Sequence, residues 1–297
     1  FAGGQSNPTY KLQTPARNYV LRRKPMGELL PSAHQVDREH RVMAALHPTG
    51  FPVPRQYGLC EDDAVIGSAF YVMEMVVGRT IWDGAMPDLT PAQRCDHYHA
   101  MIDTLADLHN VDHVAAGLET FGRPGNYFER QVSRWIKQYR GAETEHMPAM
   151  ESLIEWLPRT VPEQTRTSIV HGDYRVDNMV FAPGTEPRVL AVLDWELCTL
   201  GDPIADLTYY LMSWVTEPEG RSGVMGLTGP DTGIPHLEEM LERYCARTGR
   251  DGVPQLDWYF AFNLFRLASI VQGIKKRVLI GTASHARAEE TAKRVPM

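Results

Sequence analysis

The sequence has few cysteines, no long apolar run and no surplus of positive charge. Its four cysteines, Cys60, Cys95, Cys198 and Cys245, lack C-x-x-C spacing, which is typical of reduced thiols and not of a disulfide framework. No apolar stretch approaches the roughly 20 residues that a membrane span needs, so no membrane partner is expected. The formal net charge is −7, which gives no basic footprint for nucleic acid.

Targeting signals, internal repeats and low-complexity segments are also not apparent, although the chain begins at Phe1. Together with the scattered cysteines, this favours a cytoplasmic protein. The 297 residues, 43% of them hydrophobic and 23% charged, suffice for two lobes with a sizeable core. The sequence gives no indication of the oligomeric state.

One polar segment lies between apolar runs in the middle of the chain. His171, Asp173 and Asn178 have the spacing H-x-D-x-x-x-x-N, and a Val- and Leu-rich run after a Pro-Gly turn ends at Asp194. This pattern predicts strand, loop, strand, turn and strand, with acidic groups at the strand ends. A carboxylate that accepts a hydroxyl proton and oxygen ligands for Mg²⁺ are what phosphoryl transfer needs. Singly, each residue is more often a turn or capping residue; only the set favours a function.

The segment resembles the catalytic region of kinase-like phosphotransferases. The loop is similar to the H-R-D-x-x-x-x-N loop of protein kinases, and Asp194-Trp-Glu is similar to their D-F-G. The His-Gly-Asp variant, followed by Leu-Asp-Trp-Glu and Gly201-Asp-Pro-Ile-Ala-Asp-Leu207, resembles the aminoglycoside phosphotransferase and choline kinase family. Within that family the chain is most similar to the branch found fused to acyl-CoA dehydrogenases. The motifs occur in the family's order over most of the chain.

The resemblance implies a role for each residue of the motif. Asp173 would be the catalytic base, and Asn178 and Asp194 would be the Mg²⁺ ligands, with Asp194 bridging the nucleotide phosphates. Asp206 would be a buried carboxylate that braces the loop. His171 is expected to be structural and to bond a backbone group near Asp194.

Two further acids of the segment stay open as alternatives. Asp177 lies beside the predicted metal ligand Asn178 and is explained equally well as a solvated carboxylate. Glu196 lies two residues after Asp194, within reach of metal or substrate.

The N-terminus carries a glycine loop between two short strands. At Gly3 and Gly4 a backbone N–H can approach a phosphate closely, and Ser6 and Asn7 add donors. A hairpin turn explains the glycines equally well by themselves. In the resembled family a G-G-x-S-N-x-T-Y loop covers the nucleotide phosphates, which implies that role for these residues.

The strand from Tyr19 to Arg22 occupies the place of the kinase V-A-I-K strand. Alternation puts Val20 and Arg22 on one face, so Arg22 is expected to point at the phosphates. Arginine in place of lysine departs from the kinase pattern, because the two side chains are not interchangeable. Arg23 and Lys24 are alternatives for the role.

A helix is predicted from about Ala33 to Leu46. Its apolar spacing places Glu39 on the inward face, where a carboxylate needs a partner. A pair with Arg22 would match the Lys–Glu pair of an active kinase lobe. The alternative is a surface pair with Arg38 or Arg41.

The strand from Ala69 to Val76 is expected to pass into the hinge between the lobes. By position along the chain, backbone groups from Glu74 to Gly78, including Met75, would bond the adenine edge. An ordinary strand and turn would have the same local sequence.

Four histidines lie in or near a helix predicted from Thr90 to His109. They are His97, His99, His109 and His113. No zinc site is expected there, because i,i+2 spacing separates His97 from His99 and no carboxylate or cysteine cluster accompanies them.

The fold class predicted is α+β, a two-lobed protein-kinase-like fold. Residues 1–76 would form a small antiparallel nucleotide-binding lobe, and residues 77–297 a mostly helical catalytic and substrate-binding lobe. Further helices are expected at residues 126–140, 207–214, 237–247 and 256–277. The function implied is transfer of the ATP γ-phosphate, with Mg²⁺, to a hydroxyl of a small molecule; GTP stays open in place of ATP.

The acceptor is expected to be anionic, such as a hydroxy acid or its thioester, because charge in the C-terminal helices should complement it. From Arg266 onward the chain carries only two acids, Glu289 and Glu290, against Arg266, Lys275, Lys276, Arg277, Arg287, Lys293 and Arg294. An outward, solvated basic face is the alternative. Trp214, Trp258 and Tyr259 would suit a choline cage, but core packing explains them equally well.

Other functions stay open at this point. An aminoglycoside- or choline-type phosphotransferase would share every motif. A nucleotide-binding pseudokinase would be expected to lack the base or a metal ligand, and Asp173, Asn178 and Asp194 are all present. No flavin-type signature supports an oxidoreductase.

Overall fold

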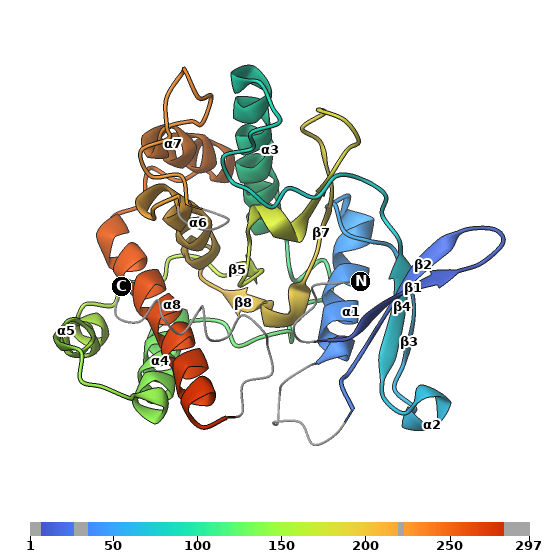
Figure 1. Ribbon diagram of the computed structural model, residues 1–297, viewed down its shortest axis with the longest axis horizontal. Coiled ribbons are helices and arrows are strands. Elements are labelled where there is room, and N and C mark those ends of the chain that lie inside the picture. Colours follow the sequence, from blue (N-terminus) through green and yellow to red (C-terminus); the bar gives the residue numbers. More distant parts are fainter. Residues whose placement is uncertain (1–6, 27–34, 219–222, 282–297) are drawn as a thin grey trace.

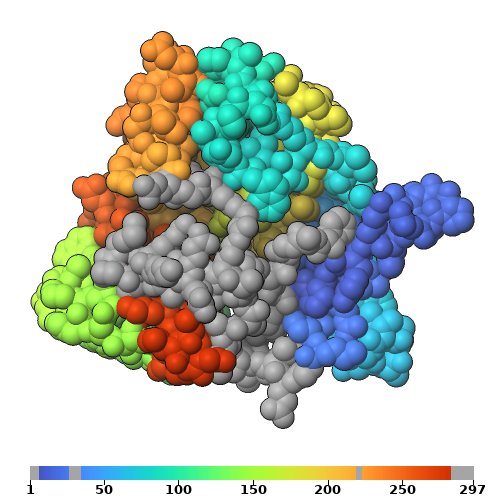
Figure 2. Space-filling model, in the orientation of Figure 1, coloured from blue at the N-terminus to red at the C-terminus, as the bar shows by residue number. Residues whose placement is uncertain are grey.

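The first quarter of the chain folds into a four-stranded antiparallel sheet, in which the strand Phe70–Glu74 alternates between buried and less buried side chains. In this computed structural model, which describes residues 7–26, 35–218 and 223–281, the strand order is β1-β2-β4-β3. The strands are β1 (Thr9–Gln13), β2 (Asn18–Arg23), β3 (Gln56–Cys60) and β4 (Phe70–Glu74). The sheet lies at one side of the molecule (Figure 1), and the β1–β2 hairpin projects from that side (Figure 2).

The register of β2 places Arg22 toward the rest of the molecule. Arg22 lies opposite Thr9 of β1 and Tyr71 of β4, while Leu21 lies opposite Val72. Val20, on the same face as Arg22, is buried. The predicted strand and its orientation are therefore confirmed.

Helix α1 (Val36–Leu46) covers one face of the sheet, in contact with β3 and β4. Its apolar face is buried at Val36, Val42, Met43 and Leu46, as the predicted spacing requires. Glu39 is buried on the same face. The predicted start near Ala33 lies outside the described residues, and a 3₁₀ turn follows Leu46 where the helix was expected to end.

Helices make up most of the second lobe, as predicted. They are α3 (Pro91–Asn110), α4 (Tyr127–Ala142), α5 (Pro148–Trp156), α6 (Ile204–Leu211), α7 (Leu237–Thr248) and α8 (Leu256–Leu279). Thr90 begins α3 with a capping box. The Thr90 hydroxyl accepts the backbone N–H of Gln93, and the side-chain oxygen of Gln93 accepts the backbone N–H of Thr90. Among the described residues, no helix combines the length and apolar character needed to cross a membrane.

Two short antiparallel strand pairs carry the polar segment into this lobe. Strand β5 (Ser168–Val170) pairs with β8 (Thr199–Gly201), and β6 (Met179–Phe181) pairs with β7 (Val189–Val192). Between β7 and β8, Trp195 is almost fully buried against Phe51 and His171, with ring centroids 6.0 Å and 4.6 Å away. This tryptophan therefore packs the segment after β7 against the connector that leads to β3.

The connection between the lobes is tied to β6. Arg79 exchanges two backbone hydrogen bonds of 2.8 Å with Phe181. A Cβ on Gly78 would lie 2.2 Å from the carbonyl oxygen of Phe181, so only glycine permits this approach. The segment that connects the lobes is thereby fixed against β6, the strand that follows the polar loop.

Two helices and two strands were not predicted: α2 (Asp63–Ile66), β3, α5 and β8. Strand β3 contains Gly58 and has no fully buried residue, so its sequence lacks the apolar alternation by which strands are recognised. In α5 the one buried residue is Met150. The division between lobes after residue 76 falls between β4 and α3 and stays a prediction.

Two glycines of the second lobe should respond oppositely to alanine. A Cβ on Gly201, the last residue of β8, would lie 2.4 Å from the ring of Tyr127, whereas one on Gly141 in α4 meets nothing within 4 Å. We expect Gly201→Ala to lower the free energy of unfolding by about 1–3 kcal/mol through overpacking. Gly141→Ala should raise it by about 0.5 kcal/mol through helix propensity. Chemical denaturation measures both, and an unchanged Gly201→Ala would contradict this packing.

Candidate active site

The polar loop that follows β5 begins with a residue, Gly172, at which only glycine fits. Gly172 has φ +86°, and a Cβ there would lie 2.8 Å from the carbonyl oxygen of Leu197. The following residues pass Asp173 and form a 3₁₀ turn (Val176–Asn178) directly before β6. Both candidate residues of the loop, Asp173 and Asn178, are therefore held between two short strands.

Asp206 of α6 braces the start of this loop, as the resemblance implies. Its buried carboxylate accepts the backbone N–H groups of His171 and Gly172, the latter at 2.8 Å, and lies 3.5 Å from Nε2 of His109. Burial acts to raise the pKa of Asp206, but the interactions with His109, His171 and the Gly172 N–H outweigh it and hold the pKa below its ordinary value. The ionised carboxylate thus fixes the backbone that carries Asp173.

His171 uses both ring nitrogens to hold the same region. Its Nε2–H donates to the carbonyl of Leu193 at 2.9 Å, and Nδ1 accepts the N–H of Asp173 at 3.2 Å. These two bonds leave no ring nitrogen for a substrate. The predicted structural role, bonding a backbone group beside Asp194, is confirmed.

Asp173 has a hydrogen-bond donor on each carboxylate oxygen. Oδ1 accepts the hydroxyl of Tyr209 at 2.6 Å, and Oδ2 accepts Nδ2 of Asn178 at 3.0 Å. Tyr209 was not foreseen, because the pair Tyr209-Tyr210 reads as core packing; its place three residues after Asp206, on the same helix, was the available signal. Burial, and then the charge of Asp173, raise the pKa of Tyr209, so it remains a donor.

Asn178 and Asp194 fit a hard metal ion by their chemistry. The Asn178 amide nitrogen donates to both the carbonyl and the carboxylate of Asp173, which leaves the amide oxygen as the ligand atom. The N–H of Leu193 donates to the carbonyl of Asn178 at 2.8 Å, so Asp194 follows directly beside it. Asp194 takes the left-handed conformation, φ 64°, and its side chain is 35% exposed. Amide and carboxylate oxygens are the donors that Mg²⁺ prefers.

Arg22 joins the sheet to this pair of residues. Its Nε lies 2.9 Å from the Glu39 carboxylate, and its Nη2 donates to Oδ1 of Asp194 at 2.8 Å. The ion pair expected between β2 and α1 is therefore present. The alternative cations lie elsewhere: Lys24 is 3.9 Å from Asp37, and Arg23 donates to the carbonyl of Lys24.

Glu39 is a buried acid of the site, with 1% of its side chain exposed. It accepts the hydroxyl of Tyr71 at 2.9 Å and the amide of Asn7 at 2.6 Å. Burial raises the pKa of Glu39 to about 7, and the neighbouring Arg22 opposes that rise. Asn7 thus connects the predicted glycine loop to the ion pair.

The remaining predicted nucleotide contacts are placed less directly. Gly3, Gly4 and Ser6 lie outside the described residues. At the predicted hinge, Glu74 is exposed and donates its N–H to the carbonyl of Arg55 at 2.8 Å, and Met75 is half-buried against the core. Their contact with an adenine edge stays a prediction.

The two alternative acids differ in their surroundings. Asp177 pairs with Arg175, and 7% of its side chain is exposed, so it is not the solvated carboxylate that was considered. Glu196 lies 3.6 Å from Nη2 of Arg22, on the same side as Asp194. Glu196 is therefore placed near the predicted metal ligand.

A cation of α8 lies behind the loop. Arg266 donates to the carbonyl of Gly172 at 2.7 Å, and its guanidinium lies 4.9 Å from the ring centre of Tyr209. Lys275 pairs with Glu145, and Lys276 donates to the carbonyl of Gly141. Of the described basic residues of α8, Arg266 is thus the one that contacts the loop of Asp173.

The three aromatic residues considered as a choline cage are core residues. Trp258 stacks on Phe262 with 5.8 Å between ring centres, and Tyr259 is buried with it. Trp214 is buried and donates its indole N–H to the carbonyl of Pro235. Core packing, the alternative given for them, is what the structure shows.

The expectation that no carboxylate or cysteine cluster accompanies the histidines is wrong for His99. His99 lies within 3.9 Å of the Cys95 sulfur and 2.7 Å from a carboxylate oxygen of Glu239. The sequence separates Glu239 from His99 by 140 residues, so the pattern around His99 could not reveal it. His97, by contrast, is a core residue whose Nδ1 bonds the carbonyl of Gln93.

The sequence matches one enzyme family and several curated proteins over most of its length. The sequence profile of the phosphotransferase enzyme family matches residues 1–259. Mouse acyl-CoA dehydrogenase family member 10 is 47% identical over 296 residues, 99% of this chain and 28% of that protein. Human acyl-CoA dehydrogenase family member 11 is 43% identical over 286 residues, 96% of this chain and 36% of that protein. The chain spans about a third of the length of these curated relatives.

Solved structures agree on the fold. A candidate aminoglycoside phosphotransferase from Ralstonia eutropha JMP134 has a TM-score of 0.91 and 51% identity, covering 98% of this chain and 86% of that one. An aminoglycoside phosphotransferase, APH(4)-Ia, solved with AMP-PNP and hygromycin B, has a TM-score of 0.62 and 14% identity, covering 99% and 91%. At that identity the second likeness shows the fold alone.

The buried ion pair gives a stability test of the strand register. Arg22→Ala leaves the carboxylate of Glu39 buried without its cation, which should lower the free energy of unfolding by about 3 kcal/mol. The double variant Arg22→Ala/Glu39→Gln should recover at least half of that loss, because no unpaired charge remains. Arg23→Ala should stay within about 0.5 kcal/mol of the parent protein. Urea denaturation of the four proteins measures these differences.

A larger loss for Arg23→Ala than for Arg22→Ala would mean that the register of β2 is wrong. Equal stability of the single and double variants would mean that Arg22 and Glu39 do not interact.

Proposed function

The chain belongs to the phosphotransferase enzyme family, and on that premise we propose that it transfers the γ-phosphate of ATP or GTP to a hydroxyl group of a small molecule. The observation that carries the proposal is the meeting of four residues at one place. Asp173 contacts Asn178, Asn178 lies beside Asp194 through its bond to Leu193, and Asp194 holds Arg22. These are a base, two oxygen ligands and a cation in contact with one another.

Asp173 is the proposed general base. It accepts the proton of the acceptor hydroxyl as that oxygen attacks the γ-phosphorus, and the bond from phosphorus to the β–γ bridging oxygen breaks, releasing ADP or GDP. Its carboxylate oxygens have two lone pairs each, so they can accept this hydroxyl in addition to the bonds from Tyr209 and Asn178. The existing bonds hold the carboxylate in one orientation before the acceptor arrives.

The proposed Mg²⁺ ligands are the amide oxygen of Asn178 and the carboxylate of Asp194. The ion supplies positive charge to the nucleotide phosphates when bound. Arg22 now donates to Asp194, and we propose that it exchanges this carboxylate for a phosphate oxygen while it keeps Glu39. Glu39 then positions the guanidinium in both states.

The nucleotide would lie between the sheet lobe, residues 1–76, and the helical lobe, residues 77–297. The residues proposed to contact it are Gly3, Gly4, Ser6, Asn7, Arg22, Glu74 and Met75, with Glu39 acting through Arg22. Asn7 supports this placement, because its bond to Glu39 brings the N-terminal loop to the cation.

The proposed acceptor is a hydroxy acid or a hydroxyacyl thioester. Arg266 supports an anionic acceptor, since its guanidinium lies against Gly172 and Tyr209, the neighbours of Asp173. The choline alternative has lost its support, because Trp214, Trp258 and Tyr259 are in the core. The relatives are named acyl-CoA dehydrogenases, and this chain corresponds to a part of each, which favours an acyl substrate.

Removal of the base should separate turnover from nucleotide binding. Asp173→Asn should lower kcat by a factor of about 10²–10⁴, the usual contribution of a general base. The dissociation constant for Mg-ATP should change little, because the phosphates are held by other residues. Turnover by coupled ADP release and affinity by calorimetry measure the two effects.

Asp177→Asn is the matched control, since it removes the other carboxylate of the same loop and should retain most of the turnover. Near-normal turnover of Asp173→Asn, or a loss as large in Asp177→Asn, would refute the assignment of the base.

The acceptor class can be tested by competition between charge types. With Mg-ATP, we expect kcat/KM for hydroxy acids or their CoA esters to exceed that for choline and kanamycin by about tenfold or more, because Arg266 would repel a cation. ADP release, with phosphorylated product identified by mass spectrometry, measures the four values.

A clear preference for choline or kanamycin would overturn the charge argument and leave phosphoryl transfer standing. No phosphorylated product from any acceptor class would contradict the transfer itself.

A further inference from the structure

A ladder of paired side chains joins α3 to α7, away from the loop of Asp173. Three rungs have the same separation of 140 residues, so the two helices run in the same direction. The rungs are His99 with Glu239 at 2.7 Å, Asp103 with Arg243 at 2.7 Å, and Asp107 with Arg247 at 2.6 Å. On each helix the members are spaced four residues apart and therefore share one face.

The first rung reverses the polarity of the other two. In the second and third rungs α3 supplies the carboxylate and α7 supplies the guanidinium. In the first rung α7 supplies the carboxylate, that of Glu239. The opposing side of that rung is built from Cys95 and His99, one helical turn apart on α3. A cation held by these two residues would make the first rung a charge pair like the others.

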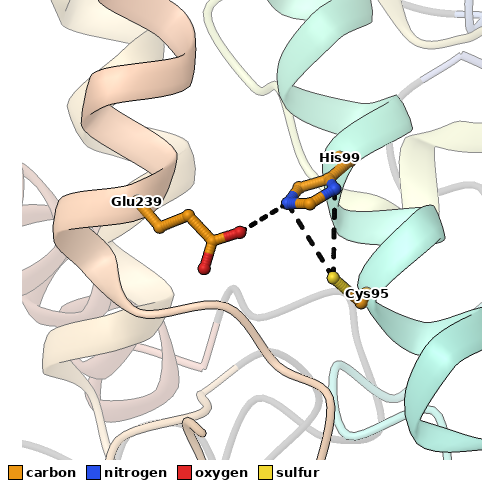
Figure 3. A group of neighbouring side chains, drawn as sticks. All are labelled: Cys95, His99 and Glu239. Atoms are coloured by element: carbon orange, nitrogen blue, oxygen red, sulfur yellow. Dashed lines mark hydrogen bonds and ion pairs between the residues drawn. The ribbon is translucent and has the colours of Figure 1, made fainter. Parts of the chain in front are cut away.

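The three side chains are arranged as a metal-binding set. Figure 3 shows the imidazole of His99 between the Glu239 carboxylate and the Cys95 sulfur, with the sulfur 3.8 Å from Nε2. All three ligand atoms lie within 4.8 Å of one another. In a tetrahedral zinc site, ligand atoms are about 3.3–3.7 Å apart, as the metal–ligand bond lengths require. Small rotations of partly exposed side chains would close the difference.

We propose that Cys95, His99 and Glu239 bind one zinc ion that joins the first half of α3 to the start of α7. A thiolate, an imidazole and a carboxylate form a donor set that suits zinc, and three protein ligands leave the fourth position for water. Zinc is bound by the thiolate, so binding displaces the thiol proton. Burial, and then the charges of Glu239 and Asp96, raise the pKa of Cys95, while Arg243 opposes them; the same negative charges attract a cation.

A second cluster shows what distinguishes this one. Glu143, His146 and Glu151 also lie close together, but Arg140 donates to both carboxylates and already supplies the positive charge. In the first cluster Arg243 is engaged by Asp103 one turn away. Among the described residues, no guanidinium therefore bonds the set at Cys95 as Arg140 bonds the set at Glu151.

The zinc ion would order a part of the chain beyond the two helices. Arg94, next to Cys95, donates to the carbonyls of Thr232 and Leu89, which ties the segment before α7 to the start of α3. A Cβ on Gly233 would overlap the backbone of Pro91, so this segment is already in close contact with α3. A metal at Glu239 would fasten the first turn of α7 beside these contacts.

Cobalt(II) titration of the chelator-treated protein tests the site without reference to activity. We expect one equivalent of Co²⁺ to give a thiolate-to-cobalt charge-transfer band together with visible bands of four-coordinate intensity, and Zn²⁺ to abolish both. Cys95→Ser should lose the charge-transfer band. His99→Asn and Glu239→Gln should weaken Zn²⁺ binding by roughly tenfold or more, as loss of a ligand does. Zn²⁺ should also raise the Tm of the parent protein and leave that of Cys95→Ser unchanged.

Cys60→Ser and Glu238→Gln are the matched controls and should bind Co²⁺ like the parent protein. The Glu239 side chain is 49% exposed, so Glu239→Gln tests the site even if a substitution on α3 impairs folding. Absence of the charge-transfer band, its persistence in Cys95→Ser, or equal affinities of Glu239→Gln and Glu238→Gln would overturn the proposal.

Discussion

The site depends on one buried cation that is shared between two lobes. Arg22 leaves the sheet with 11% of its side chain exposed and contacts Glu39 of α1 on one side and Asp194 on the other. A buried carboxylate such as Glu39 is costly without a partner, so the position of α1 and the position of Asp194 are linked through the same guanidinium. Trp195, the next residue after Asp194, is packed against Phe51, which makes the link between the lobes apolar as well as ionic.

A second buried charge fixes the other half of the site. Within the part of the chain that the structure describes, no arginine or lysine pairs with Asp206; backbone N–H groups and His109 stabilise it instead. Because hydrogen bonds to a carboxylate are directional, they set the path of the chain at Gly172, and His171 extends that order to the carbonyl of Leu193. The two halves of the site meet at Asn178. Its side chain donates to Asp173, and its carbonyl accepts the N–H of Leu193, the residue before Asp194.

The sequence predicted the parts of this arrangement that follow from short-range spacing. The alternation of a strand predicted which face of the sheet Arg22 occupies, and the period of a helix predicted that Glu39 points inward. The resemblance to a family predicted that Asp206 braces the loop of Asp173. Tyr209 was missed because a tyrosine pair on a helix is usually core, and its hydroxyl finds Asp173 only through the folded loop. Strand β3 and α5 were missed because few of their side chains are buried, so their hydrophobic pattern is weak. The partner of His99 was missed because it lies on another helix, and no local pattern encodes that distance.

The proposed mechanism depends on Arg22 changing partners when a nucleotide binds. The most direct measurement is a crystal structure of this chain with Mg²⁺ and a non-hydrolysable ATP analogue. We expect Mg²⁺ about 2.1 Å from the amide oxygen of Asn178 and from the carboxylate of Asp194. We also expect Arg22 to bond a phosphate oxygen while it keeps Glu39, with its bond to Oδ1 of Asp194 broken. A metal held by other residues, or phosphates bound while Arg22 remains on Asp194, would refute this exchange of partners.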